Sequence, residues 1–172
     1  MSFLTELDAL LPKKVRGLDV TLYADWAGFY SACPLSRPML VKHGPQWQEN
    51  YAPERPDCVP YYQEKFFGED GVGIVLSKDG VPVTGLVYRR VAKDEVENTL
   101  RLGEPAGKIG IRPLFRQLGI ARVSYSIHKQ FPSTHAHMER MAALHGCKRT
   151  VTEDELYIHY VDELPEDCHG DA

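Results

Sequence analysis

One segment of the sequence combines residue types and spacing suited to holding a diphosphate. It runs Ile111-Arg112-Pro113-Leu114-Phe115-Arg116-Gln117-Leu118-Gly119-Ile120-Ala121-Arg122. A strand ending at Pro113, followed by a helix from near Arg116 toward His128, would expose main-chain N–H groups where a phosphate binds favourably. Gly119 lets a ligand approach the backbone, and Ala121 keeps the next contact small. The segment therefore predicts a diphosphate cradle, to which Arg116 adds a positive charge.

The elements before this segment are expected to build a sheet. Val72 to Val91 predicts a hairpin, because apolar residues alternate on both sides of Lys78-Asp79-Gly80 and Asp-Gly supplies the positive φ angles of a tight turn. The charged residues 92–98 are expected to form a loop. Leu100 and Leu102 then indicate the start of another strand.

Two further elements are expected after the segment. A helix is predicted from Thr134 to His145, with Gly146 as the left-handed residue that ends it. Its inner face is expected to carry four residues at helical spacing, namely Met138, Met141, Ala142 and His145. Alternation from Leu156 to Val161 predicts a final strand.

The front of the chain is predicted to hold shorter elements. Met1 to Leu11 has the pattern of an amphipathic helix capped by Ser2, and Leu18 to Leu22 alternates as a first strand would. Trp26 to Cys33 is expected to be helical. The stretch from Pro34 to Pro60 is rich in proline and aromatic residues, which favours an ordered but irregular loop.

Length and composition predict one domain. The 172 residues are 43% hydrophobic and 26% charged, which is ordinary for a globular protein. We expect a single domain over residues 1–164, with a variable front part to about residue 65 and a core over 66–162. The acidic residues 165–172 are expected to be a loose tail.

Charge and cysteine usage exclude several classes of protein. The formal net charge is −4 and the basic pairs are separated by acids, so nucleic acid is not an expected partner. No apolar run reaches the length of about 18 residues that spans a membrane, and the start lacks the basic residues of a secretion signal. The four scattered cysteines form no CxxC pair, which favours free thiols in the cytoplasm.

The segment and its surroundings resemble the GNAT superfamily of N-acetyltransferases. The superfamily's pattern, Gln or Arg, two residues, Gly, one residue, Gly or Ala, has its counterpart in Arg116-Gln-Leu-Gly119-Ile-Ala121. The hairpin around Lys78-Asp79-Gly80 resembles the family's second and third strands. Ser133 to Cys147 resembles the helix before its Gly-Phe turn, with Cys147 in place of the Phe. Some phage-encoded and virion GNAT-like proteins are similarly reduced in their C-terminal halves.

The resemblance implies an α/β (α+β) fold, a single domain whose central mixed, mostly antiparallel sheet is flanked by helices. It also implies acetyl-CoA or another acyl-CoA as co-substrate and an amine of a small molecule or protein as acceptor. The residues expected to bind the cofactor are Ile111, Arg112, Arg116, Gln117, Leu118, Gly119, Ile120, Ala121 and Arg122. In this family a base deprotonates the amine, which attacks the thioester directly, and an acid protonates the leaving thiolate.

The sequence departs from the family at the catalytic step. The family's tyrosine, four residues before the Gly of the Gly-Phe turn, corresponds to Ala142 here, and the region of a full fifth strand is compressed into Lys129 to Pro132. The substitutes considered are Tyr125, His137 and the neighbouring His135 and His145 as acid, and Glu104 as base. Each has a structural alternative, a core position for Tyr125 and a solvated loop for Glu104.

Two functions therefore stay open after the sequence analysis. The first is an N-acyltransferase, and the second is a non-catalytic virion or regulatory protein that kept the fold and binds a protein partner. No metal site is predicted, because the histidines lack the HExxH spacing and the cysteines lack paired CxxC spacing. An exposed final strand would allow pairing with a second copy of the chain.

Overall fold

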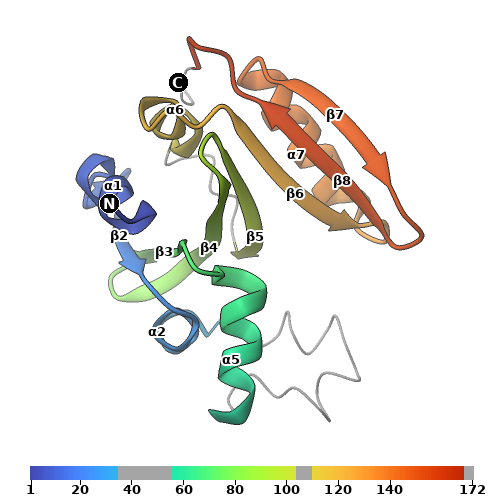
Figure 1. Ribbon diagram of the computed structural model, residues 1–172. Helices are drawn as coiled ribbons and strands as arrows, with labels where there is room; N and C mark the ends of the chain where they lie inside the picture. Colours follow the sequence, from blue (N-terminus) through green and yellow to red (C-terminus); the bar gives the residue numbers. More distant parts are fainter. Residues whose placement is uncertain (35–55, 104–109, 169–172) are drawn as a thin grey trace. The chain divides into compact units, whose positions relative to one another are not determined.

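A mixed sheet organises the computed structural model, which describes residues 1–34, 56–103 and 110–168 (Figure 1). The strands are hydrogen-bonded in the order β1-β2-β3-β4-β5-β6-β8-β7. Their pairing is mostly antiparallel, whereas β5 and β6 run parallel. The prediction of a mixed, mostly antiparallel sheet with flanking helices is confirmed.

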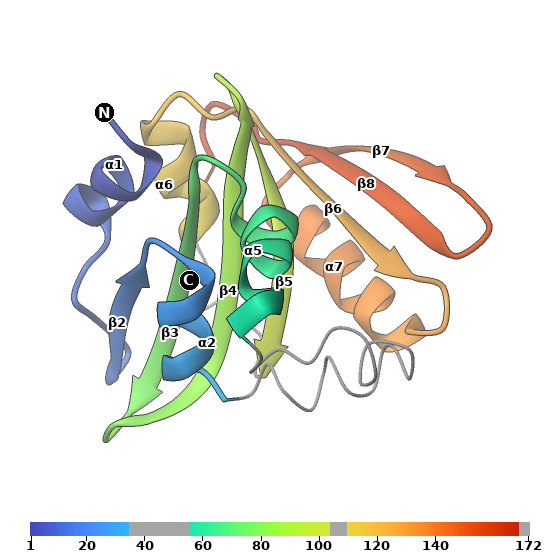
Figure 2. The ribbon, with the colours of Figure 1, turned by 60° about the horizontal axis from the view of Figure 1, so that its bottom comes forward.

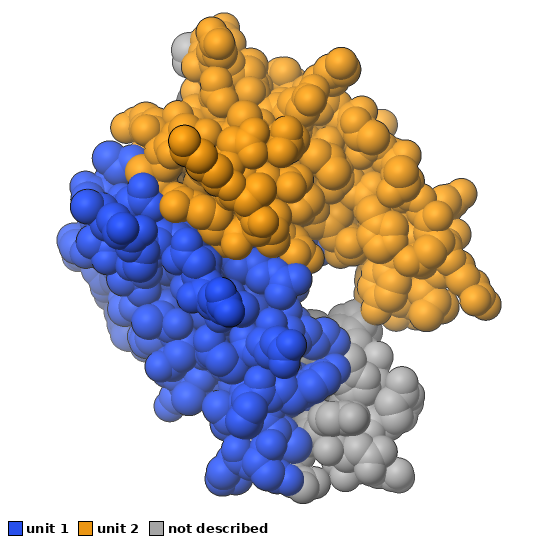
Figure 3. Space-filling view, in the orientation of Figure 1, with its two compact units in different colours: residues 1–89, 99–106 blue, residues 90–98, 107–172 orange. Residues whose placement is uncertain are grey.

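The chain divides into two compact units, which Figure 3 colours separately. Unit 1 comprises Met1–Arg89 and Thr99–Ala106, and unit 2 comprises Arg90–Asn98 and Gly107–Ala172. The boundary crosses β4 (Val81–Ala92) and β5 (Glu95–Gly103), so each unit contains part of both strands.

The other elements of unit 1 include the predicted N-terminal helix, first strand, second helix and hairpin strand, together with short elements that were not predicted. They are α1 (Phe3–Leu10), β1 (Lys14–Val15), β2 (Leu18–Tyr23), α2 (Trp26–Ala32), η1 (Pro56–Cys58), α5 (Val59–Tyr62), η2 (Gln63–Phe67) and β3 (Gly71–Lys78). The Ser2 side chain accepts a hydrogen bond from the Thr5 amide and caps α1 as predicted. Asp79 and Gly80 have φ angles of 51° and 80°, and they form the predicted hairpin turn. Residues 35–55 of the predicted irregular loop lie outside the described residues.

An aromatic core holds unit 1 together. Trp26 and Phe29 on α2 are fully buried, as are Tyr62 and Phe67 of the α5–η2 stretch. The ring of Trp26 stacks on that of Tyr62 with centroids 5.1 Å apart. Figures 1 and 2 show α1 on one side of strands β2 and β3, and α2 and α5 on the other. Burial of these large side chains is the main stabilising contribution in this unit.

Unit 2 packs one long helix against a strand group. Besides the start of β5, it contains α6 (Ile111–Gln117), β6 (Arg122–His128), α7 (Pro132–Leu144), β7 (Lys148–Glu153) and β8 (Tyr157–Glu163). Gly146 follows α7 with a φ of 69°, which confirms its predicted left-handed role. Ala142 and His145 are buried as predicted for the inner face of α7. The helix begins at Pro132, however, and neither Ser133 nor Thr134 caps it.

The predicted helix from Arg116 toward His128 is wrong. Arg116 lies in the last turn of α6, and Arg122–His128 is strand β6. This stretch forms a strand instead of a helix because Val123, Tyr125 and Ile127 alternate with serines, so that one face of a pleated strand is buried. The predicted strand ending at Pro113 is also wrong, since Pro113 lies in the first turn of α6. A helix accepts proline there because the N–H groups of the first turn have no intrahelical partner.

The structure differs from the sequence prediction in three other elements. The predicted loop over residues 92–98 is wrong, since β4 extends to Ala92 and β5 begins at Glu95. The fifth strand is not compressed into Lys129 to Pro132, because β6 supplies it in full. Strand β7 was not predicted at all. Its residues are mostly exposed and polar, so the strand has no apolar alternation to mark it.

No helix among the described residues is long and apolar enough to cross a bilayer. The four cysteines are free thiols, with Cys33 and Cys58 buried.

We expect Gly73→Ala to destabilise unit 1 by about 1–3 kcal/mol through overpacking. A Cβ atom on Gly73 would lie 2.6 Å from Cδ2 of Phe29 and 3.0 Å from Cζ of Phe67. Urea unfolding followed by tryptophan fluorescence measures the change. Val81→Ala, at a position 62% exposed, is the control and should change the free energy of unfolding by less than about 0.5 kcal/mol. Equal stability of Gly73→Ala and wild type would contradict the packing described.

Candidate functional site

The predicted diphosphate segment ends a helix instead of opening one. The amide of Gly119 donates to the Arg116 carbonyl at 3.1 Å, and that of Ile120 donates to the Phe115 carbonyl at 2.9 Å. Gly119 has a φ of 79°, which serves to terminate α6. A helix C-terminus carries partial negative charge, which disfavours an anion there.

The next two amides of the segment are also engaged. Those of Ala121 and Arg122 both donate to the Asp94 carbonyl, at 2.8 and 3.0 Å. The main-chain N–H groups expected to bind a diphosphate therefore already have carbonyl partners. The structural premise of the cradle is wrong, and a cofactor role for these residues stays a prediction.

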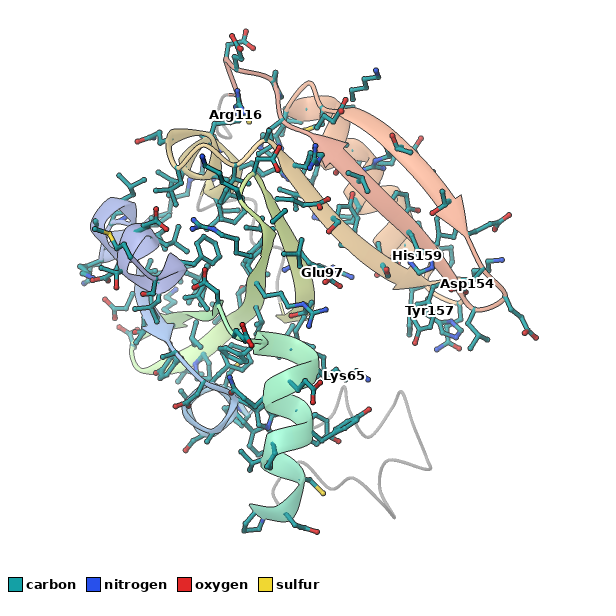
Figure 4. All side chains as sticks on the ribbon, viewed as in Figure 1. Lys65, Glu97, Arg116, Asp154, Tyr157 and His159 are labelled. Atoms are coloured by element: carbon teal, nitrogen blue, oxygen red, sulfur yellow. The ribbon has the colours of Figure 1, made fainter. Side chains whose placement is uncertain are left out.

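The nine residues predicted to bind the cofactor are spread along α6 and the start of β6. Ile111 and Arg112 are buried in the first turn of α6, and Gln117 is exposed at its end. Arg116 is half-buried, and its Nε atom has no hydrogen-bond partner among the described residues. Figure 4 shows Arg116 on α6, apart from the labelled residues of the β7–β8 hairpin.

The structure describes two of the three residues predicted to be catalytic. Tyr125 lies on β6 and is 2% exposed, and His137 is half-buried on α7. Glu104 lies outside the described residues. The position of the family's tyrosine, Ala142, is buried on α7. Their catalytic roles stay predictions.

A buried ion triad occupies the interior of unit 2. The carboxylate of Asp162 on β8 is fully buried and accepts hydrogen bonds from two arginines. Arg112 of α6 donates through Nη2 at 2.9 Å, and Arg149 of β7 donates through Nε at 2.8 Å. The arginine side chains are 9% and 15% exposed. Two cations around one anion leave the cluster with a net positive charge.

Tyr125 completes this network and ties it to α7. Its hydroxyl donates to Asp162 Oδ2 at 2.8 Å and accepts from Arg149 Nη2 at 2.6 Å. Arg149 Nη2 also donates to the carbonyl of Met138, at 2.7 Å. Burial, followed by the charge of Asp162, raises the pKa of Tyr125 far above its usual range. The hydroxyl is therefore protonated at every physiological pH, and its hydrogen bonds are made to Asp162 and Arg149.

The position of Asp162 in the sequence is a signal for this network. Asp162 stands two residues after Tyr160 and therefore continues the inward-facing row of β8. Arg149 is its direct cross-strand neighbour on β7. A lone aspartate on the apolar face of a strand requires a buried partner. Because β7 was not predicted, the sequence did not identify Arg149 as that partner.

The opposite face of the same strands is polar. Because side chains alternate, Glu97 of β5 and Ser124 of β6 share this face and stand opposite each other in the register. Ser126 and His159 form the corresponding pair between β6 and β8. Asp154, in the turn before β8, accepts a hydrogen bond from His159 at 2.8 Å.

The parallel pairing of β5 with β6 is short. Its register covers Glu95–Glu97 opposite Arg122–Ser124, whereas β5 continues to Gly103 and β6 to His128. The register therefore ends within both strands.

Among the described residues no three metal-ligating side chains lie together.

Replacing Asp162 with asparagine removes the only anion of the ion triad while preserving its shape. We expect Asp162→Asn to lower the free energy of unfolding by about 3–5 kcal/mol, because two buried arginines lose their counter-ion. Urea unfolding measures the change. Glu163→Gln, at the exposed neighbouring position, is the matched control and should shift stability by less than about 0.5 kcal/mol. A loss for Asp162→Asn of less than about 1 kcal/mol, as for an exposed ion pair, would contradict a structural role.

Acid should remove the contribution of the same carboxylate. Burial alone would raise the pKa of Asp162, but the hydrogen bond from Arg149 and the charge of Arg112 outweigh burial and hold the pKa below its ordinary value. A folded-state pKa below the unfolded value means that the contribution is complete above the ordinary aspartate pKa of about 3.9 and is lost as the pH falls through the folded-state value. We expect the unfolding free energy to fall below about pH 4, and this part of the loss to be absent from Asp162→Asn. Parallel profiles of unfolding free energy against pH for the wild type and Asp162→Asn would contradict this contribution of the Asp162 carboxylate.

The fold has counterparts among solved acetyltransferases. An acetyltransferase from Streptococcus agalactiae 2603 has a TM-score of 0.55 and 14% identity, over 87% of this chain and 99% of its own. A GNAT-family acetyltransferase from Bacillus anthracis has a TM-score of 0.53 and 13% identity, over 90% and 98% of the two chains. A Salmonella typhimurium protein, assigned as an acetyltransferase and solved with its cofactor acetyl-CoA, has a TM-score of 0.52 and 15% identity, over 89% and 98%.

Sequence comparison adds no relative to these structures. No protein-family model matches the chain, and no curated protein matches it by sequence. At identities of 13–15%, structural likeness establishes the architecture and leaves the chemistry open. The chain has the fold of the GNAT acetyltransferases.

Proposed function

We propose that this protein binds an acyl-coenzyme A and transfers its acyl group to an amine by direct attack. The single observation that carries this proposal is the short register between β5 and β6, which ends at Glu97 and Ser124 although both strands continue. Main-chain groups at the edge of a strand can hydrogen-bond the amides of an extended ligand, as in strand addition. In this proposal the pantetheine arm of the coenzyme binds along β6 beyond Ser124.

The diphosphate of the coenzyme requires positive charge near this strand edge. We assign this role to the side chain of Arg116, which is half-buried as a residue and whose buried Nε has no hydrogen-bond partner among the described residues. The amides after Arg116 donate to carbonyls and are not part of the proposed site. A guanidinium–phosphate contact of this kind is a charge-assisted hydrogen bond.

Direct attack requires a base for the amine. We assign this role to Glu97, which is half-buried at the last paired position of β5. A carboxylate there can accept the proton that the amine loses as the new C–N bond forms and the C–S bond breaks. The leaving thiolate takes a proton from water, since an ordinary thiol has a pKa of about 8.5. The proposal therefore does not require the buried Tyr125 as an acid.

A second function is favoured by one observation. The position of the family's tyrosine holds Ala142, and its methyl group cannot donate a proton. A protein that binds acyl-coenzyme A, or a partner protein, without turnover would fit this substitution. Binding and turnover must therefore be measured separately.

Calorimetric titration with acetyl-CoA tests the binding step. We expect saturable binding that Arg116→Ala weakens about tenfold, as loss of a charge-assisted hydrogen bond implies. Arg140→Ala, at an exposed position on α7, is the matched control and should bind as wild type does. Absence of both heat and thermal stabilisation at saturating acetyl-CoA would contradict the proposal.

Release of the free coenzyme thiol, followed over a panel of amines, tests the transfer step. We expect Glu97→Gln to bind acetyl-CoA normally but to lower kcat by about 10²–10⁴-fold, the range of general-base catalysis. Glu139→Gln on α7 serves as the carboxylate control. Binding without thiol release on any amine would favour the second function.

A further inference from the structure

A serine, a histidine and an aspartate form a hydrogen-bonded chain on the exposed face of the β6–β8 pair. Ser126 on β6 stands directly opposite His159 on β8. Ser126 Oγ lies 2.6 Å from His159 Nδ1, and His159 Nε2 lies 2.8 Å from Asp154 Oδ2. Figure 4 shows His159 and Asp154 together near the end of the β7–β8 hairpin. All three residues belong to unit 2.

The turn before β8 fixes the aspartate. Asp154 Oδ1 accepts the amides of Leu156 and Tyr157 at 2.8 and 2.7 Å. The Tyr157 hydrogen bond, followed by those of His159 and Leu156, lowers the pKa of Asp154 to about 2. The carboxylate is therefore ionised at neutral pH and can only accept hydrogen bonds.

An ionised Asp154 determines which nitrogen of His159 carries the proton. Nε2 donates to the carboxylate, so in the neutral ring Nδ1 has the free lone pair. The hydroxyl of Ser126 then donates to Nδ1 across 2.6 Å. This is the order of a nucleophile, a base and an orienting carboxylate.

We propose that Ser126 is a nucleophile that accepts acyl groups from activated esters, with His159 as its base and Asp154 as the positioning residue. Ser126 Oγ forms a bond to the acyl carbon as its proton passes to His159 Nδ1, the bond to the leaving phenolate breaks, and His159 then releases that proton to the solvent. Water next attacks the acyl-serine and gives a proton to His159 Nδ1, and His159 passes this proton to Ser126 Oγ as the carboxylic acid leaves.

The surroundings of the three residues define the class of donor. Main-chain N–H groups of paired strands lie in the plane of the sheet, so they do not point at an oxyanion above its face. The leaving group must therefore be a good one, as in an aryl ester or a thioester. Tyr157 is 40% exposed, and its ring is inclined by 29° to that of His159, with centroids 6.4 Å apart. This aromatic surface favours an aryl ester.

Ser124 provides a matched control on the same strand. It lies two residues from Ser126 on the same face of β6, and its hydroxyl donates to the Val96 carbonyl at 3.5 Å. A serine whose hydroxyl faces a carbonyl has no base to take its proton. The two serines therefore differ in the feature that the proposal requires.

Acylation by p-nitrophenyl acetate, read by intact mass and peptide mapping, tests the proposal on the full chain. We expect one acetyl group on Ser126, an initial burst of p-nitrophenolate, and no acetylation of Ser124. Ser126→Ala should abolish the burst, whereas Ser124→Ala should keep it. His159→Gln should slow acylation by about 10²-fold or more, the lower range of general-base catalysis. Asp154→Asn should slow it less, because the base remains.

Peptide mapping is essential because amines also react with aryl esters. Burial lowers the pKa of Lys65, in unit 1, to about 8, so this lysine is an expected background site. Thermal unfolding of each variant identifies any that fail to fold, and Ser126→Cys, which retains a nucleophile, provides a second measurement. Acetylation of Ser126 no faster than of Ser124, an unchanged rate in His159→Gln, or an adduct on His159 in place of Ser126 would overturn the proposal. None of these results depends on coenzyme A binding.

Discussion

The carboxylate of Asp162 is the group on which the architecture of unit 2 depends. It joins α6 through Arg112, β7 through Arg149 and β6 through Tyr125, and Arg149 extends the network to α7. Buried charges of this kind are expensive unless they are fully paired, so the arrangement tolerates few alternatives. The chain packs charge where most small domains pack apolar side chains. This network connects the strands whose opposite face carries Ser126 and His159.

The sequence predicts those parts of the fold that local chemistry determines. The Asp79-Gly80 turn, the Ser2 cap and the Gly146 helix end were all found because each depends on a few adjacent residues. Strand β7 and the start of β5 were missed because both are polar or charged, and their pairing partners make them strands. Tertiary pairing overrides local propensity at such positions.

The misplaced helix start shows how a short motif can mislead about a site. Arg116 to Ala121 has the spacing of a phosphate-binding pattern, but it covers the end of α6 and the turn after it instead of the start of a helix. The sign of the helix dipole and the engaged amides both oppose the predicted role. The polar face with Glu97, Ser126 and His159 could not be predicted, because those residues become neighbours only through the pairing of β5, β6 and β8. The sequence therefore indicated the fold better than the site.

The carbon-13 resonance of the Asp162 carboxyl group, followed by NMR as the pH is lowered from neutral, tests the central claim most directly. The expected result is a midpoint below the ordinary aspartate value of about 3.9, with the amide protons of β6 and β8 losing protection over the same range. A midpoint at or above the ordinary value, or titration without loss of protection in these strands, would contradict the account of a carboxylate that holds unit 2 together.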